Sequence, residues 1–96
     1  MNIKYDADRF FSGDDPGKPL AEITFTRRED RRLVVDHTFT DPSLRGQGIG
    51  RKLVESVARY AREEGYKLLA TCPYARKVLQ EPEFEDVYAG SKEEQP

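Results

Sequence analysis

The sequence predicts an α+β fold in which a mixed, mostly antiparallel sheet contains one parallel pair of strands joined by a long helix. Alternating apolar and polar residues indicate strands before residue 41, and apolar residues recur at every fourth position from Ile49 onward. A further apolar strand follows Gly65. A strand, a helix and a strand in this order form a βαβ unit, whose strands run parallel with a right-handed crossover. The 96 residues fit one domain, which we place at residues 1–90 and expect to be followed by a disordered tail over 91–96.

The region before the long helix is predicted to contain three strands. Ile3–Asp6 is a short strand, Leu20–Arg27 alternates apolar and polar residues, and Leu33–Thr40 is rich in β-branched residues. Glycines and prolines predict a turn-rich connection over 7–19. The charged segment Arg28–Arg32 is predicted to be a solvated hairpin tip rather than a phosphate-binding loop.

The long helix and the elements after it are also predicted from the pattern. Gly65 is a typical C-terminal stop for the helix, and Tyr66–Cys72 is predicted to be the second parallel strand. Pro73 opens a short helix over Tyr74 to Gln80, which Pro82 ends. The apolar face of the long helix consists of Ile49, Leu53, Val57 and Ala61.

The composition argues against several classes of function. The formal net charge of -2 disfavours a general nucleic-acid-binding protein, which usually carries a basic excess. No apolar run approaches the ~20 residues of a membrane span, and the N-terminus lacks the apolar core of a signal peptide. The single cysteine can form neither an internal disulfide nor, alone, a thiolate metal site. We therefore expect a cytoplasmic protein with no metal and with neither a nucleic acid nor a membrane as partner.

The glycines Gly46, Gly48 and Gly50 stand directly before the long helix, although glycine is a poor helix former. A helix N-terminus presents unpaired backbone N–H groups and a partial positive charge, so it can bind phosphate where no side chain blocks the approach. Arg45 adds a guanidinium whose fork suits phosphate oxygens. The dinucleotide fingerprint and the nucleoside-triphosphate loop do not match, because Arg51 stands where each requires a glycine. From the glycine cluster alone, the loop is either a phosphate-binding site or a plain turn.

The stretch DPSLRGQGIGRKLV, residues 41–54, resembles the acyl-CoA-binding signature of the GNAT acetyltransferase superfamily. The resemblance rests on Arg45-x-x-Gly48-x-Gly50, flanked by Pro42 and Leu53. It implies that main-chain N–H groups of the loop and of the helix N-terminus hold the pyrophosphate of acetyl-CoA, the acyl donor.

Other segments are similar to the short, single-domain YjdJ-type N-acetyltransferase-like proteins of this superfamily. They are DHT at Asp36–Thr38, CPYARKVL at Cys72–Leu79 and PEF at Pro82–Phe84. Two positions depart from the pattern: Phe39 stands where many members carry a polar or acidic residue, and Thr40 replaces the usual valine. The coenzyme-binding residues that the resemblance implies are Thr40, Leu44, Arg45, Gly46, Gln47, Gly48, Ile49, Gly50, Arg51, Tyr74, Arg76 and Lys77.

Three of these residues have structural alternatives. Tyr74 has Val78 four positions further on, a spacing that favours a core role over stacking on the coenzyme. For Arg76 and Lys77, a solvated surface position is favoured over contact with the coenzyme phosphates.

Acetyl transfer to an amine requires the neutral amine, and freeing a lysine-like amine at pH 7 costs ~4–5 kcal/mol. His37 is the single histidine of the chain. Histidine is the side chain that exchanges protons near neutral pH, so His37 is a candidate for proton transfer. Strand alternation places it on the face of Leu33, Val35 and Phe39, with Asp36 pointing the opposite way. The alternative is a half-buried histidine bonded to a backbone carbonyl.

Cys72 ends the second parallel strand, at the edge where such a sheet delivers groups to a crevice. Its parity with Leu68 and Ala70 indicates an apolar setting, which raises a thiol pKa and makes the residue inert. The N-terminus of the helix after Pro73 would instead lower that pKa. The resemblance implies a thiol near the acetyl thioester, as a transient acyl acceptor or as an acid for the leaving thiolate. Because their strands are adjacent, a pair of His37 and Cys72 is geometrically possible.

We therefore expect an acetyl-CoA-dependent N-acetyltransferase that transfers acetyl directly to an amine, without an obligatory covalent intermediate. A non-catalytic acyl-CoA-binding or adaptor domain is the alternative, because 96 residues leave little surface for a substrate pocket. An interaction module whose loop binds another anion is a third possibility. The sequence does not distinguish a protein lysine, a protein N-terminus, a polyamine or a small metabolite as acceptor. It is compatible with a monomer and does not determine the oligomeric state.

Overall fold

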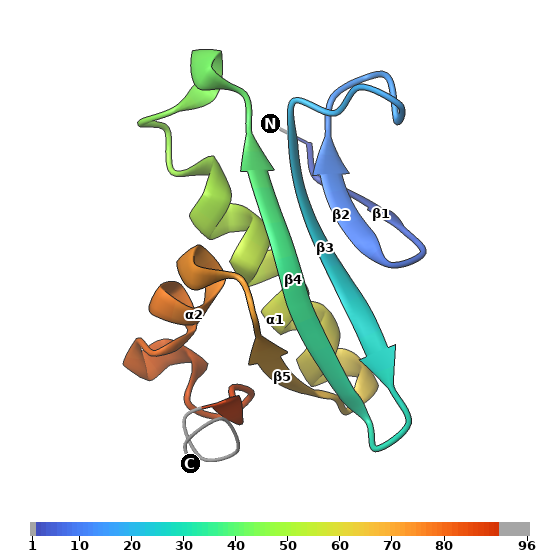
Figure 1. The fold of residues 1–96 in the computed structure, drawn as a ribbon, viewed down its shortest axis with the longest axis vertical. Helices are drawn as coiled ribbons and strands as arrows, with labels where there is room; N and C mark the ends of the chain where they lie inside the picture. Colours follow the sequence, from blue (N-terminus) through green and yellow to red (C-terminus); the bar gives the residue numbers. More distant parts are fainter. Residues whose placement is uncertain (1, 91–96) are drawn as a thin grey trace.

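The computed structural model describes residues 2–90, which form a five-stranded sheet with helices packed against it (Figure 1). In chain order the elements are β1 (Lys4–Asp6), β2 (Arg9–Ser12), β3 (Ala21–Arg28), β4 (Arg32–Thr40), the 3₁₀ helix η1 (Pro42–Leu44), α1 (Ile49–Glu64), β5 (Lys67–Ala70), α2 (Pro73–Leu79) and the 3₁₀ helix η2 (Pro82–Phe84). The predicted tail at 91–96 lies outside the described residues. Within residues 2–90, no helix has the length and apolar composition needed to cross a membrane.

The predicted class of fold is confirmed. The strands lie in chain order from β1 to β5, and β1 to β4 pair antiparallel. β4 and β5 pair in parallel, from Arg32 opposite Lys67 to Val35 opposite Ala70. α1 connects these two strands and lies behind the sheet in the view of Figure 1. Gly65 ends α1 as predicted, with a left-handed φ of 77° that glycine adopts without a Cβ clash.

The sheet has four strands before α1 rather than the three predicted. β2 lies inside the segment predicted to be a turn-rich connection, and its Phe10 pairs with Ile23 of β3. A two-residue loop joins β1 to β2, and its Ala7 has a left-handed φ of 58°. β2 is too short to show a clear alternation, and the glycines and prolines that follow dominate the local pattern. Pairing with β3, rather than the local sequence, defines this strand.

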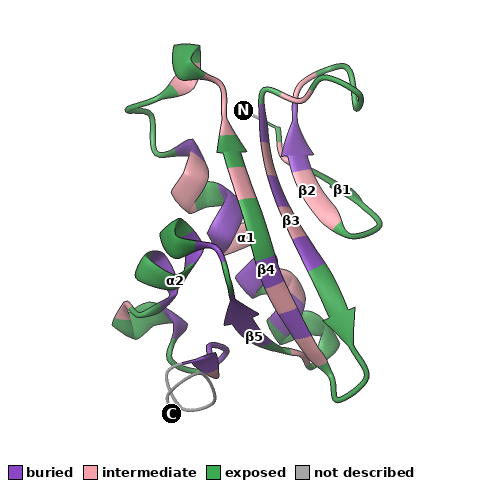
Figure 2. Cartoon of the chain, in the orientation of Figure 1, coloured by how far each residue is buried: buried purple, intermediate pink, exposed green. Residues whose placement is uncertain are grey.

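A β-bulge in β4 changes which side chains face α1. The pairing of β4 with β3 shifts between Val35 and His37, so Asp36 is the extra residue. Leu33 and Val35 are buried, whereas Asp36 and His37 are both exposed (Figure 2). The prediction that His37 shares the face of Leu33 and Val35 is therefore wrong, because strict alternation does not hold across a bulge.

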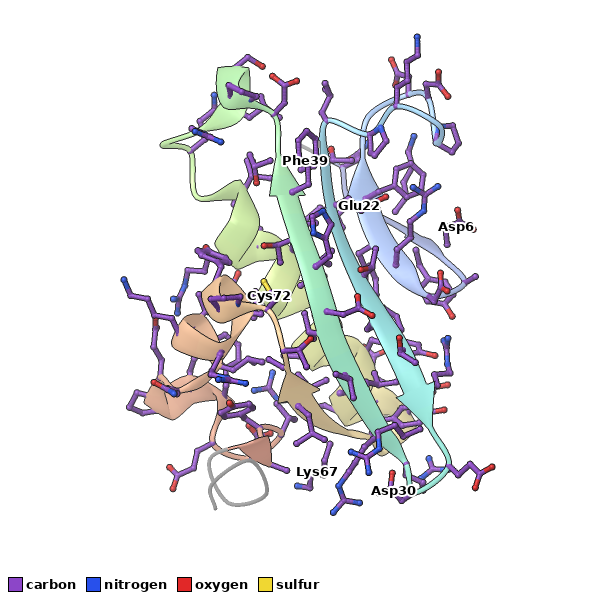
Figure 3. All side chains as sticks on the ribbon, viewed as in Figure 1. Asp6, Glu22, Asp30, Phe39, Lys67 and Cys72 are labelled. Atoms are coloured by element: carbon purple, nitrogen blue, oxygen red, sulfur yellow. The ribbon has the colours of Figure 1, made fainter. Side chains whose placement is uncertain are left out.

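Beyond the bulge, β4 presents a new set of residues to the interior. Thr38 pairs with the buried Ile23 and shares its inner face. Phe39 pairs with Glu22 and points outward, with 40% of its surface exposed. Figure 3 shows Phe39 near the end of β4 and Cys72 where β5 leads into α2.

One hydrophobic core lies between the sheet and the helices. Its largest fully buried members include Phe25, Leu33, Leu53, Leu68, Leu79 and Phe84. After η2, the chain returns to pair with β5: the N–H of Leu68 donates to Val87 at 2.7 Å, and the N–H of Ala89 donates to Leu68 at 2.9 Å. This covering of the outer edge of β5 was not predicted from the sequence.

Arg31, at the tip of the β3–β4 hairpin, contacts the C-terminal end of α1. Its guanidinium donates to the backbone carbonyl of Glu64 and, at 3.3 Å, to that of Gly65. A helix C-terminus has carbonyl groups without intrahelical partners and carries a partial negative charge. The predicted hairpin tip is present, but one of its arginines caps the long helix.

Replacing Arg31 with alanine is expected to lower the free energy of unfolding by about 1 kcal/mol, because carbonyls at the end of α1 lose a charged donor. Urea unfolding followed by circular dichroism measures this change. Arg28→Ala is the matched control, since the Arg28 guanidinium pairs with the exposed Asp30 at 3.5 Å, and surface pairs contribute little. Equal losses in the two variants would contradict the capping role of Arg31.

Candidate functional site

The end of β4, the loop after it and the first turns of α1 and α2 line an open cavity of about 480 Å³. The cavity exists because the pairing of β4 with β5 ends at Val35 and Ala70. The backbone N–H groups of Thr71 and Cys72 both donate to the carbonyl of Val35, at 2.9 and 3.3 Å, and α2 begins directly afterwards. The cavity is lined by Thr38, Thr40, Leu44, Arg45, Gly46, Gly48, Ile49, Gly50 and Tyr74.

The loop between β4 and α1 presents backbone, rather than bulky side chains, to this cavity. Gly46 and Gly48 have left-handed φ angles of 85° and 72°, and a Cβ on either would meet no atom within 4 Å. Both glycines are therefore required by the backbone conformation, and the space beside them is free. Asp41 holds the start of the loop: it accepts hydrogen bonds from the Ser43 hydroxyl at 2.7 Å and the Ser43 N–H at 2.9 Å, which lower the pKa of Asp41.

α1 begins without a side chain that competes for its free backbone donors. Its N-cap is Gly48, and its first turn contains no acidic residue. The N–H groups of a first turn lack intrahelical acceptors and carry a partial positive charge. Arg45 is exposed and lines the same cavity. This combination of backbone donors, free space and a guanidinium fits a phosphate or diphosphate group.

Gly50 has a different role from the two glycines before it. A Cβ on Gly50 would lie 3.0–3.1 Å from the ring and hydroxyl of Tyr74, so the missing side chain lets Tyr74 lie against the first turn of α1. Tyr74 is 41% exposed and lines the cavity, whereas Val78 is buried. The core role that the spacing to Val78 favours is therefore wrong for Tyr74. Burial of part of the ring raises the pKa of the Tyr74 hydroxyl, which keeps it neutral.

Some residues that the resemblance assigns to the coenzyme are engaged elsewhere. The Arg51 guanidinium pairs with Glu81 at 2.7 Å and with Glu83, and the hydrogen bond to Glu81 raises the pKa of Arg51. This pairing directs the Arg51 side chain toward α2 and η2, and its predicted contact with the coenzyme stays a prediction. Arg76 donates to the carbonyl of Ala70 at 3.0 Å. The cavity lining includes none of Gln47, Arg51, Arg76 and Lys77.

The Cys72 thiol lies behind the cavity wall, 8% exposed, with its sulfur 3.5 Å from the hydroxyl oxygen of Thr38. Burial is the largest influence on the thiol and acts to raise its pKa. The Thr38 hydroxyl and the backbone N–H groups of Ala75, Tyr74 and Thr38 act in the opposite direction, and together they hold the pKa of Cys72 below its ordinary value. An apolar strand setting alone would raise the pKa of the thiol and make it inert. The Thr38 hydroxyl and the backbone N–H groups at the start of α2 lower that pKa instead.

His37 and Cys72 are not brought together. His37 lies on the outer face of β4, and the β4 side chain that contacts the Cys72 thiol is Thr38. Asp36 lies on the outer face as well, where its carboxylate accepts hydrogen bonds from two threonine hydroxyls of β3. A Cys–His pair is therefore wrong for this fold. Thr38 was not predicted from the sequence as a site residue. It faces inward because of the bulge at Asp36, and no residue type in this segment indicates a bulge.

The fold and the cavity define a class of protein. A parallel strand pair that separates beside a helix N-terminus cleared of side chains is suited to hold an anionic ligand in the gap. The sequence matches the family model described as GCN5-related N-acetyl-transferase over residues 9–87, which is most of the chain. The protein therefore belongs to the GCN5-related N-acetyltransferase family.

Individual relatives agree with this assignment. A GCN5-like protein from Staphylococcus aureus, solved by NMR, is 39% identical with a TM-score of 0.79, covering 93% of this chain and 88% of that chain. An uncharacterised N-acetyltransferase from Methanocaldococcus jannaschii is 32% identical over 73 residues, which are 70% of this chain and 32% of that protein. The chain thus spans about a third of the length of this curated relative. An aminoglycoside N-acetyltransferase solved with CoA is 22% identical with a TM-score of 0.56, covering 75% of this chain and 63% of that chain, and shares the fold.

Proposed function

We propose that this domain binds acetyl-CoA and transfers the acetyl group directly to the amine of an acceptor. The observation that carries the proposal is the cavity beside the N-terminus of α1, where Gly46 and Gly48 leave backbone donors next to free space. The diphosphate of coenzyme A supplies the charge and the acceptor oxygens that such donors bind. A protein of the same fold was solved with CoA, which supports this class of ligand.

In this proposal the backbone from Arg45 to Gly50 binds the diphosphate, and the Arg45 guanidinium adds a charged donor. The acyl end enters the gap where β4 and β5 separate, on the side that Thr38 and Thr40 line. Tyr74 also lines the cavity. Arg51, paired with its carboxylates, stabilises the junction of α1 with α2 instead of binding the coenzyme.

The reaction joins the acceptor nitrogen to the thioester carbonyl carbon, breaks the carbon–sulfur bond and releases coenzyme A as a thiolate, while the nitrogen loses a proton. The outer face of β4 exposes His37, and an acceptor can reach that face without passing through the cavity. We therefore assign to His37 the role of the base that accepts the proton of the amine. Cys72, on the inner side, has a lowered pKa that suits it to exchange a proton with the leaving thiolate.

The runner-up is a non-catalytic acyl-CoA-binding domain. The observation that favours it is the outer face of β4, where Phe39 is 40% exposed and His37 is also open to solvent. An acceptor bound there depends on contacts with an open surface rather than with an enclosed pocket.

Titration calorimetry with coenzyme A tests the binding step. We expect binding that weakens with salt, as phosphate contacts require, and no comparable binding of ATP at the same concentration. Absence of coenzyme A binding would refute both the enzyme and the runner-up. Equal binding of ATP would indicate a general anion site instead.

Release of free coenzyme A thiol from acetyl-CoA, measured with a panel of polyamines, lysine peptides and peptides with free N-termini, tests turnover. We expect release with at least one amine class, and a loss in kcat on the order of a hundredfold for His37→Ala, with coenzyme affinity unchanged. Tight coenzyme binding without thiol release from any amine would favour the runner-up. A His37→Ala variant with unchanged kcat would remove His37 from the mechanism.

A further inference from the structure

The residue that faces the Cys72 thiol from β4 is Thr38, because the bulge at Asp36 turns His37 outward and Thr38 inward. We propose that Thr38 is a positioning residue, which contacts the cavity on one side, orients the Cys72 sulfur and stabilises its thiolate form through the threonine hydroxyl. The inference deepens the proposed acyltransferase function, on which the use of the thiol depends.

The geometry supports a directional contact. The Thr38 Oγ1 lies 3.5 Å from the Cys72 Sγ, within hydrogen-bonding range for sulfur, and the contact is partly buried. Thr38 also lines the cavity, so this one side chain contacts both the thiol and the space that an acyl group would enter. A threonine hydroxyl can accept from a thiol and donate to a thiolate, and it serves both protonation states without moving.

Of the groups that lower the pKa of the Cys72 thiol, the Thr38 hydroxyl is the one that a side-chain substitution can remove. α2 contributes its backbone N–H groups at Tyr74 and Ala75, which no side-chain substitution removes. Tyr74, the titratable neighbour on α2, stays neutral because burial raises its pKa. The α1 side chains buried in the same core, Ile49, Leu53, Val54 and Val57, are apolar. The histidine of β4 lies on the opposite face, so the threonine hydroxyl is the side-chain group of β4 that bears on the sulfur.

A purely structural role for Thr38 would require only a side chain of similar shape. Valine has nearly the shape of threonine but no hydroxyl, whereas serine keeps the hydroxyl and loses a methyl group. The two variants therefore separate hydrogen bonding from packing. Because Cys72 is the single cysteine in the chain, any thiol signal belongs to this residue.

The experiment is a pH titration of the ultraviolet absorbance of the Cys72 thiolate in the full chain without coenzyme, with the signal of Cys72→Ser subtracted to remove tyrosine ionisation. In Thr38→Val we expect the thiol pKa to rise, so that the thiolate fraction at neutral pH falls on the order of tenfold. Thr38→Ser is expected to titrate like the unmodified chain. Thr71→Val, which removes an exposed hydroxyl adjacent to Cys72 in sequence, is the control and is expected to change nothing.

Two results would overturn the inference: an unchanged thiol titration in Thr38→Val, or the same rise in Thr38→Val and Thr38→Ser. Thermal unfolding of each variant establishes that it is folded. If the valine variant does not fold, Thr38→Ala is titrated in its place and judged by the same comparison with serine. Because the titration needs no coenzyme, its failure leaves the proposed function standing, and failure of coenzyme A binding leaves the titration interpretable.

Discussion

Replacing Gly48 with alanine is expected to weaken coenzyme A binding by roughly a hundredfold, or about 3 kcal/mol. Gly48 has a left-handed φ of 72°, and an alanine there is strained by about 1–2 kcal/mol, so the free loop relaxes to another conformation. Binding would then have to restore the strained conformation. The added methyl group also lies in the free space beside the backbone donors, where it obstructs a charged hydrogen bond to phosphate. Titration calorimetry at constant salt measures the loss.

Gly65→Ala is the matched control for this prediction. Gly65 has a similar left-handed φ of 77°, but it lies at the opposite end of α1. Alanine there is expected to reduce stability by a comparable amount and to leave coenzyme affinity unchanged in the folded protein. If Gly65→Ala weakened binding as much as Gly48→Ala, the loss would reflect general destabilisation, and the N-terminus of α1 would no longer be supported as the phosphate site.

Replacing Phe84 with alanine is expected to lower the free energy of unfolding by about 3–5 kcal/mol. Phe84 is 1% exposed, and its ring lies under the guanidinium of Arg51, 5.7 Å from the ring centroid. Its carbonyl also accepts from the N–H groups of Val87 and Tyr88, at 3.1 and 2.8 Å, so it anchors the segment that covers the edge of β5. Domains of this kind are stable by about 5–15 kcal/mol, so the loss is a large part of the total.

Urea unfolding measures the effect of Phe84→Ala, and Phe39→Ala is its control. The two variants remove the same atoms, but Phe39 is 40% exposed and its removal is expected to cost less than about 1 kcal/mol. Similar losses in the two variants would show that η2 is not an anchor of the core. Coenzyme A is expected to restore part of the stability of Phe84→Ala, because a ligand that binds the folded state shifts the unfolding equilibrium.

The elements that the sequence predicted well are those whose signals are local. The four-residue period of α1, the stop at Gly65 and the proline that opens α2 are each contained within a few turns of chain. The glycine loop is also local, because a left-handed φ at Gly46 and Gly48 is a property of single residues. From these local features alone, the sequence predicts a parallel strand pair beside a helix N-terminus.

The features that were predicted incorrectly depend on partners far along the chain. β2 is a strand because β3 supplies its hydrogen bonds, and Tyr74 leaves the core because Gly50 gives it room against α1. The Arg51 side chain pairs with carboxylates of residues 81 and 83, about thirty positions away in sequence, and the local pattern does not indicate this pairing. Long-range pairing of this kind overrides local spacing.

The sequence alone thus determined the long helix, the parallel strand pair and the glycine loop between them, because backbone conformation and amphipathic periodicity are set by neighbouring residues. Only the tertiary structure decided which β4 side chain meets the Cys72 thiol. Side chains in a strand alternate between the two faces, so one extra residue reverses the direction of every side chain beyond it. Because Asp36 is such a residue, Thr38 points to the inner face and His37 to the outer face.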